Sequence, residues 1–116
     1  SESAYLCLKL AWIYRGEIQE AKANGAAQER ISMYEKYEKE YLEDAYRGFK
    51  QARETEYPPI AGMDENTITY LLTSIGIHCG KIDEARRYGS ALLISRTASM
   101  KLKNKTRDVL ETIKKN

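Results

Sequence analysis

The sequence predicts an all-α protein: one domain over residues 1–116, folded as an antiparallel array of about five helices with a long first hairpin. Apolar residues recur at three- and four-residue spacing along most of the chain. The 116 residues include only seven glycines and two prolines, too few to break up long helices. A phrase of one bulky apolar residue, two acids and an alanine occurs at Leu42–Ala45 and again at Ile82–Ala85. Acids near the positive end of a helix followed by a small residue are typical of the second helix of a hairpin, so each half is predicted to be a helix pair. A four-helix bundle is the alternative architecture.

The first helix is predicted from about Ser3 to Asn24. Asn24-Gly25 is a pair suited to a helix stop. Because a helix that is apolar on two faces has neighbours on both, we expect packing on either side. Its two apolar stripes are Leu6, Leu10, Ile13 and Tyr14, and Tyr5, Leu8 and Trp12.

The second helix is predicted within Ala26–Glu56, a segment with no proline and a single glycine. The charged residues between its apolar positions have mixed signs. We expect them to face the solvent and to form ion pairs within the helix. Tyr57-Pro58-Pro59 ends the helix, because proline lacks a backbone donor and disfavours helical geometry in the residue before it. The core-facing seam of this helix is Tyr34, Tyr37, Tyr41, Ala45, Phe49 and Ala52.

Three shorter helices are predicted in the second half. Asp64 is a natural N-cap for a helix that runs to about Cys79 and is closed by Gly80. A fourth helix starts near Ile82 or Asp83 and extends to Leu93. A fifth covers Lys103 to Lys115, with Val109, Leu110 and Ile113 as its apolar face. Residues 97–104 leave open whether the last two helices merge.

Part of the chain resembles the tetratricopeptide repeat. The matching residues are Thr69-Tyr70-Leu71-Leu72 at the opening of a helix, then Gly80, Ile82, Glu84 and Ala85 at the repeat spacing. Gly76 departs from the pattern, because the repeat prefers an aromatic residue there. The resemblance implies two tetratricopeptide-like hairpins, the first extended by about twenty residues at its bend, with the last helix covering one exposed end.

A second resemblance is to an uncharacterised bacterial family, a domain of unknown function. It rests on the phrases Ala4–Trp12 and Gly62–Glu65, followed by Thr67 and Tyr70-Leu71. The chain is similar to the carboxy-terminal helical domain of that family, whose members carry a cysteine-bearing amino-terminal segment. The family's metal-type cysteine pairs have no counterpart here, so the resemblance implies no zinc site and no settled activity.

The residues give little support for catalysis, and no enzyme activity, cofactor or metal site is predicted. The single histidine, His78, is not paired by motif with a serine or cysteine, and Asp64-Glu65 is explained by helix capping. Cys7 and Cys79 lack metal-binding spacing and are expected to be reduced thiols rather than a disulfide.

No membrane span or signal peptide is expected either. The longest apolar run, Ala4–Tyr14, is interrupted by Lys9 and falls short of the ~20 residues that cross a bilayer. A cytoplasmic location follows as the expectation.

Surface recognition is therefore the predicted function, with a protein or peptide as partner. In tetratricopeptide hairpins the first helix of each pair lines the concave face, and an arginine among aromatic residues suits a peptide groove. The alternative is that the same residues pack against the fifth helix or a second copy of the chain. The expected peptide-binding residues are Tyr5, Leu8, Trp12, Arg15, Tyr70, Ser74, Ile77 and His78.

The carboxy-terminal segment suggests a different function, nucleic-acid binding. Residues 96–116 contain seven basic and two acidic side chains, whereas residues 1–95 contain 12 basic and 15 acidic ones. Because no aromatic residues are interleaved with the basic ones, a solvated helix is the favoured interpretation and nucleic acid is the second hypothesis. The phosphate-binding candidates are Lys101, Lys103, Lys105, Arg107, Lys114 and Lys115.

Self-association is the last expectation. Repeat hairpins bury their apolar faces against neighbours, so a short array leaves a face unpaired. A weak homodimer through the extended first hairpin is predicted around Ile31, Met33 and Tyr34, with a monomer as the alternative.

Overall fold

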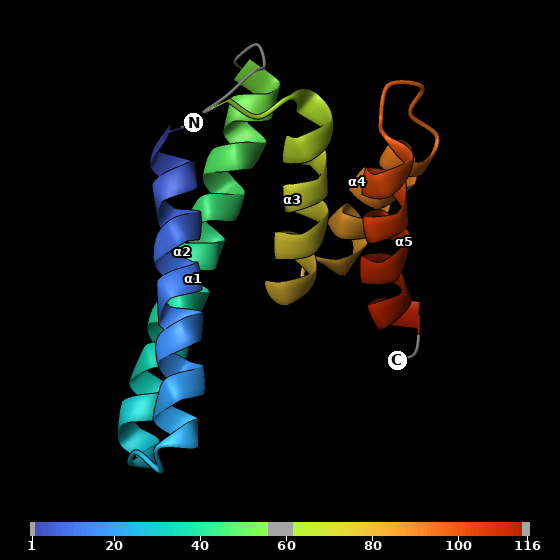
Figure 1. The fold of residues 1–116 in the computed structure, drawn as a ribbon. Helices are drawn as coiled ribbons and strands as arrows, with labels where there is room; N and C mark the ends of the chain where they lie inside the picture. Colours follow the sequence, from blue (N-terminus) through green and yellow to red (C-terminus); the bar gives the residue numbers. More distant parts are fainter. Residues whose placement is uncertain (1, 56–61, 115–116) are drawn as a thin grey trace.

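The computed structural model describes residues 2–55 and 62–114. The described residues form five helices joined by turns (Figure 1). This confirms the predicted all-α class and the number of helices. The helices are α1 (Glu2–Ala23), α2 (Gln28–Thr55), α3 (Glu65–His78), α4 (Ile82–Leu93) and α5 (Met100–Lys114).

The helices stack in sequence order. Helices α1 and α2 form a long antiparallel hairpin, α3 packs against α2, α4 pairs with α3, and α5 packs against both α3 and α4. In Figure 1 the far half of the first hairpin, where α1 turns into α2, extends well past the ends of α3, α4 and α5. The molecule therefore consists of a body and a projecting arm, with extents of 48 × 33 × 23 Å.

Local signals fix most helix ends as predicted. Gly25, with a φ of 67°, takes the left-handed conformation that closes α1. Asp64 caps α3, since its carboxylate accepts a hydrogen bond of 2.8 Å from the backbone N–H of Thr67. Tyr57-Pro58-Pro59, the predicted stop of α2, lies outside the described residues.

Helices α4 and α5 are separate, which resolves the ambiguity over residues 97–104. Helix α4 ends at Leu93, and α5 starts at Met100, three residues before the predicted start. The earlier start is explained by Ser99, whose hydroxyl accepts a hydrogen bond of 3.1 Å from the N–H of Leu102 and so caps the helix.

One interpretation of the repeated phrase is wrong. Leu42–Ala45 does not lie at the start of a helix but in the middle of α2, which continues through it because nothing there breaks a helix. Only the second copy has acids in a first turn, Asp83 and Glu84 of α4. The close-packing role of the alanine is correct for both copies, since Ala45 and Ala85 are fully buried.

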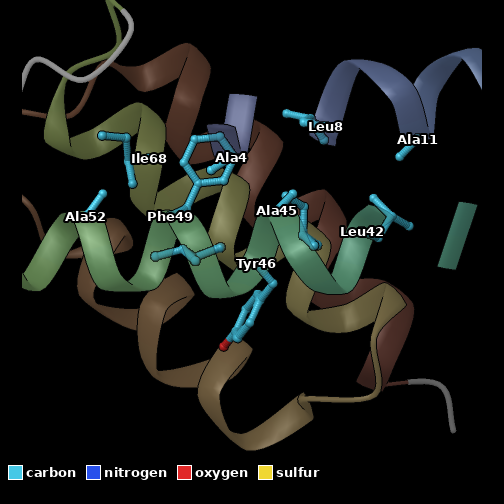
Figure 2. Close-up of a cluster of buried hydrophobic side chains, with 11 residues drawn as sticks. Ala4, Leu8, Ala11, Leu42, Ala45, Tyr46, Phe49, Ala52 and Ile68 are labelled. Atoms are coloured by element: carbon cyan, nitrogen blue, oxygen red, sulfur yellow. The ribbon is translucent and has the colours of Figure 1, made fainter. Parts of the chain in front are cut away.

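The main core lies where α2 is surrounded by α1 and α3. Figure 2 shows Phe49 directed from α2 toward Ala4 and Ile68, whereas Tyr46 extends to the other side of the helix. At the end of α1 that lies over this core, α1 and α2 approach so closely that a Cβ added to Gly48 would lie 2.6 Å from that of Ala4. Small residues therefore set the spacing of the hairpin there.

The arm has its own stabilising contacts. The ring of Tyr14 in α1 lies between those of Tyr34, Tyr37 and Tyr41 in α2, at centroid distances of 5.9, 5.3 and 5.8 Å. Aromatic pairs at such distances are favourable beyond the area that they bury. Farther along the arm, a small buried cluster is formed by Ile18, Ala21 and Ile31.

A junction centred on Tyr46 ties α2 to both α3 and α4, and Arg53 makes a second link through Thr69 of α3 and the ring of Tyr88 of α4. The buried hydroxyl of Tyr46 donates a hydrogen bond of 2.5 Å to Glu84 in the first turn of α4, and the Lys50 ammonium lies 3.0 Å from the same oxygen. Gly76 of α3 leaves room for the Tyr46 ring, since a Cβ there would lie 3.2 Å from its Cε2. Glu84 also benefits from the positive end of α4.

We predict that Tyr46→Phe lowers the free energy of unfolding by about 1.5 kcal/mol, the size of a hydrogen bond to a charged acceptor. Urea denaturation followed by circular dichroism measures this. The half-buried Tyr5 provides the control, because Tyr5→Phe should change stability by less than about 0.5 kcal/mol. Equal stability of Tyr46→Phe and the wild type would show that the hydrogen bond contributes nothing.

Acid should weaken the same junction. Hydrogen bonds from Tyr46 and Lys50 lower the pKa of the Glu84 carboxyl below its ordinary value of 4.5. The unfolded chain therefore takes up this proton first, and the stability that Glu84 provides is lost as the pH falls through its folded pKa. Glu84→Gln should destabilise the protein at neutral pH and lose less further stability on acidification, as urea midpoints across an acid pH series would show. A slope identical to that of the wild type would contradict this role.

Candidate protein-interaction face

Helix α1 is buried on one side and apolar on the other. The inner side packs against α2 through Ala4, Leu8, Ala11, Ile18 and Ala21. The bulky apolar residues that remain exposed are Leu6 (60 %), Leu10 (37 %), Trp12 (51 %) and Ile13 (58 %). Among the described helices, only α2 brings its backbone close to that of α1. The two apolar stripes predicted packing on two sides of this helix. Among the described helices only α2 packs against it, on one side.

Aromatic and basic groups alternate along the edge of α1 that contains Trp12. The Lys9 ammonium lies 4.7 Å from the centroid of the Tyr5 ring, a cation–π contact between residues one helical turn apart. Trp12 follows Lys9 by three residues and therefore lies on the same side of the helix. Tyr5 is partly buried against the core, which holds this edge in place.

The next residue along this edge, Arg15, connects α1 to α2 and to the end of α3. Its Nε donates a hydrogen bond of 2.9 Å to Glu38 of α2. The pKa of His78, the last residue of α3, is lowered first by partial burial and then by repulsion from the Arg15 charge, while Glu38 acts in the opposite direction. The end of α3 therefore lies within the electrostatic reach of the Arg15–Glu38 pair.

The predicted peptide-binding residues divide into four groups. Trp12, Arg15 and His78 reach the surface, and Tyr5, Ser74 and Ile77 are half-buried. Leu8 is only 2 % exposed and belongs to the core, which corrects its assignment as a contact residue. Tyr70 faces α5, where the Lys105 ammonium lies 5.8 Å from its ring centroid.

Two features of this face were missed at the sequence level. Glu38 was assigned to the solvated side of α2, yet it pairs with Arg15 across the hairpin. The exposed stripe of Leu6, Leu10 and Ile13 was expected to have a helical neighbour. The placement of α3 shows that no helix in residues 2–55 and 62–114 other than α2 lies against α1.

The other histidine, cysteine and acidic side chains do not gather into a metal site within the described parts of the chain. Residues 2–55 and 62–114 contain no group of three histidine, cysteine, aspartate or glutamate side chains that could hold a metal ion. Cys7 and Cys79 are half-buried free thiols, and burial raises the pKa of both. None of the helices in the described ranges has the length and apolar composition needed to cross a membrane.

The basic residues of α5 do not share one face. Helical spacing places Lys101 and Lys105 on one side of the buried stripe formed by Thr106 and Ile113, and Lys103, Arg107 and Lys114 on the other. Arg107 donates a hydrogen bond to Asn104, and Lys114 lies 3.6 Å from Glu111. Lys115, also a candidate, lies outside the described residues.

The chain belongs to the family described as "Uncharacterized protein conserved in bacteria (DUF2225)", which matches residues 1–113. This confirms the expected relation to an uncharacterised bacterial family. No curated protein and no solved structure matches the chain.

The electrostatic contact between α1 and α3 can be measured at His78. We predict that Arg15→Gln raises the pKa of His78, because the substitution removes a repulsive charge and leaves Glu38 nearby. His78 is the only histidine in the chain, so its ring signals in an NMR pH titration are unambiguous. Lys22→Gln, at the far end of α1, serves as the control and should leave the pKa unchanged. An unchanged or lower pKa in Arg15→Gln would mean that the end of α3 does not lie near Arg15 of α1 as described.

Proposed function

We propose that this domain is a non-enzymatic, tetratricopeptide-like interaction module that binds a peptide segment of a protein partner on the face shared by α1 and α3. One observation carries the proposal: Trp12, the only tryptophan, is half exposed on a helix that is otherwise well packed on its inner side. Tryptophan, tyrosine and arginine are the residues that dominate binding energy at protein interfaces. All three are present on this edge.

The tetratricopeptide-like part of the proposal is supported by the way the helices stack. Successive antiparallel pairs pack side by side, and α5 occupies the place of the first helix of a further pair, against both α3 and α4. A positive-φ glycine, Gly80, makes the turn between α3 and α4, and the buried Ala85 allows the two helices of that pair to approach closely.

The chemistry of the face indicates what kind of peptide fits. Tyr5 and Trp12 offer apolar surface for a bulky side chain of the partner, while Lys9 and Arg15 supply positive charge on either side of Trp12. Glu38 already neutralises part of the Arg15 charge, so Lys9 is the main attraction for a carboxylate. The proposed ligand is therefore an apolar segment that carries an acidic residue about one helical turn from its anchor.

We predict that Trp12→Ala weakens binding of such peptides at least tenfold, the order of a loss of about 1.4 kcal/mol at a binding hot spot. Peptides selected by the wild-type domain from a phage-displayed library would be tested by fluorescence anisotropy. Ile94, 82 % exposed between α4 and α5, is the matched control, because Ile94→Ala removes exposed apolar surface away from the face.

Two results would contradict the proposal. The first is selected peptides that bind Trp12→Ala and the wild type equally well. The second is unfolding of Trp12→Ala, which circular dichroism would detect and which would make Trp12 a structural residue.

Nucleic-acid binding remains the alternative function, with weaker support because the basic side chains of α5 lie on two sides of the helix. Binding through phosphates weakens steeply with salt. Titration of a labelled generic duplex and a single strand at low and high salt is the check, and salt-sensitive binding that is lost in Lys101→Glu/Lys105→Glu would favour this alternative.

A further inference from the structure

The outer side of α1 carries a continuous seam that the peptide-binding face does not use. Leu6, Leu10, Ile13 and Glu17 follow one another at spacings of four, three and four residues, the pattern of a helix that pairs with another helix. Leu6 and Ile13 are each more than half exposed. No helix within the described ranges covers this seam, because α2 lies against the opposite side of α1.

The charges beside the seam are self-complementary. Lys9 and Glu17 are both exposed and flank Leu10 and Ile13. If a second α1 runs antiparallel with its Ile13 opposite Leu10, its Glu17 falls opposite Leu6. Lys9 follows Leu6 by three residues, so its long side chain can reach that Glu17 on leaving the ring of Tyr5, over which its ammonium lies in the single chain. The two-fold axis then creates the same contact twice.

The parallel arrangement lacks this match. Two parallel copies would bring Glu17 next to Glu17 within the seam, and like charges at such positions repel.

We propose that this outer seam is the docking site of a second copy of the chain, joined antiparallel through α1. The sequence predicted a homodimer around Ile31, Met33 and Tyr34, whereas this proposal places the contact on the outer seam of α1. Ile31 is buried within the arm and the Tyr34 ring packs at a tilt against that of Tyr14, so of the residues first considered only Met33 remains exposed.

The dimer is weak and depends on concentration. Leu6, Leu10 and Ile13 give each copy a short apolar patch, smaller than the roughly 800 Å² per partner of a standard stable interface. Trp12 lies toward the other edge of α1, so the dimer does not depend on the proposed peptide-binding function.

The test is a charge exchange measured by sedimentation equilibrium over a wide range of concentrations. Lys9→Glu and Glu17→Lys should each raise the dimer dissociation constant by about tenfold, because both symmetric contacts become repulsive. In an equal mixture of the two variants each contact again joins opposite charges, so dimers should return. Ile13→Glu should give the monomer mass of 13.3 kDa.

Either of two outcomes overturns the proposal. One is a wild type that sediments at 13.3 kDa at every concentration. The other is a mixture of Lys9→Glu and Glu17→Lys that associates no better than each variant alone. Circular dichroism of all variants confirms that they are folded, and Ile13→Glu should still bind the selected peptides, which separates this result from a failure of the peptide-binding proposal.

Discussion

The geometry of the whole domain depends on the junction at which Tyr46 of α2 meets Gly76 of α3 and Glu84 of α4. Helix α2 is the only described helix that closely approaches both α1 and the body. The position of α1 relative to α3 therefore depends chiefly on α2, whose core cluster contains side chains of both helices. The buried ring of Tyr46 fixes the spacing between α2 and α3. Its hydrogen bond to the charged Glu84 fixes the rotation of α4 relative to α2.

Because one helix makes this connection, α1 has packed neighbours on one side and solvent on the other. That asymmetry produces both proposed interaction surfaces. The edge with Tyr5 and Trp12 turns toward the end of α3, where Arg15 and Glu38 influence His78. The outer seam with Leu6 and Ile13 turns away from the body. The two surfaces share one side chain, Lys9, and otherwise use different residues of α1.

Much of the fold follows from local signals in the sequence. The cap at Asp64 and the turn at Gly25 are where capping and backbone preferences place them. The glycine at position 76 has a structural reason, because a larger side chain there would occupy the space of the Tyr46 ring. The candidate face was harder to predict. Leu8 and Trp12 lie on the same apolar stripe, and only the tertiary packing decides that Leu8 is buried and Trp12 is half exposed.

A double-mutant cycle with Tyr46→Phe, Glu84→Gln and the double variant, measured by urea unfolding, tests the central claim most directly. If the two side chains form the junction that joins α2 to α4, their effects on the free energy of unfolding should be coupled by about 1 kcal/mol or more. Effects that add within about 0.5 kcal/mol would contradict it. The position of α1 over the body would then have to be determined by other contacts.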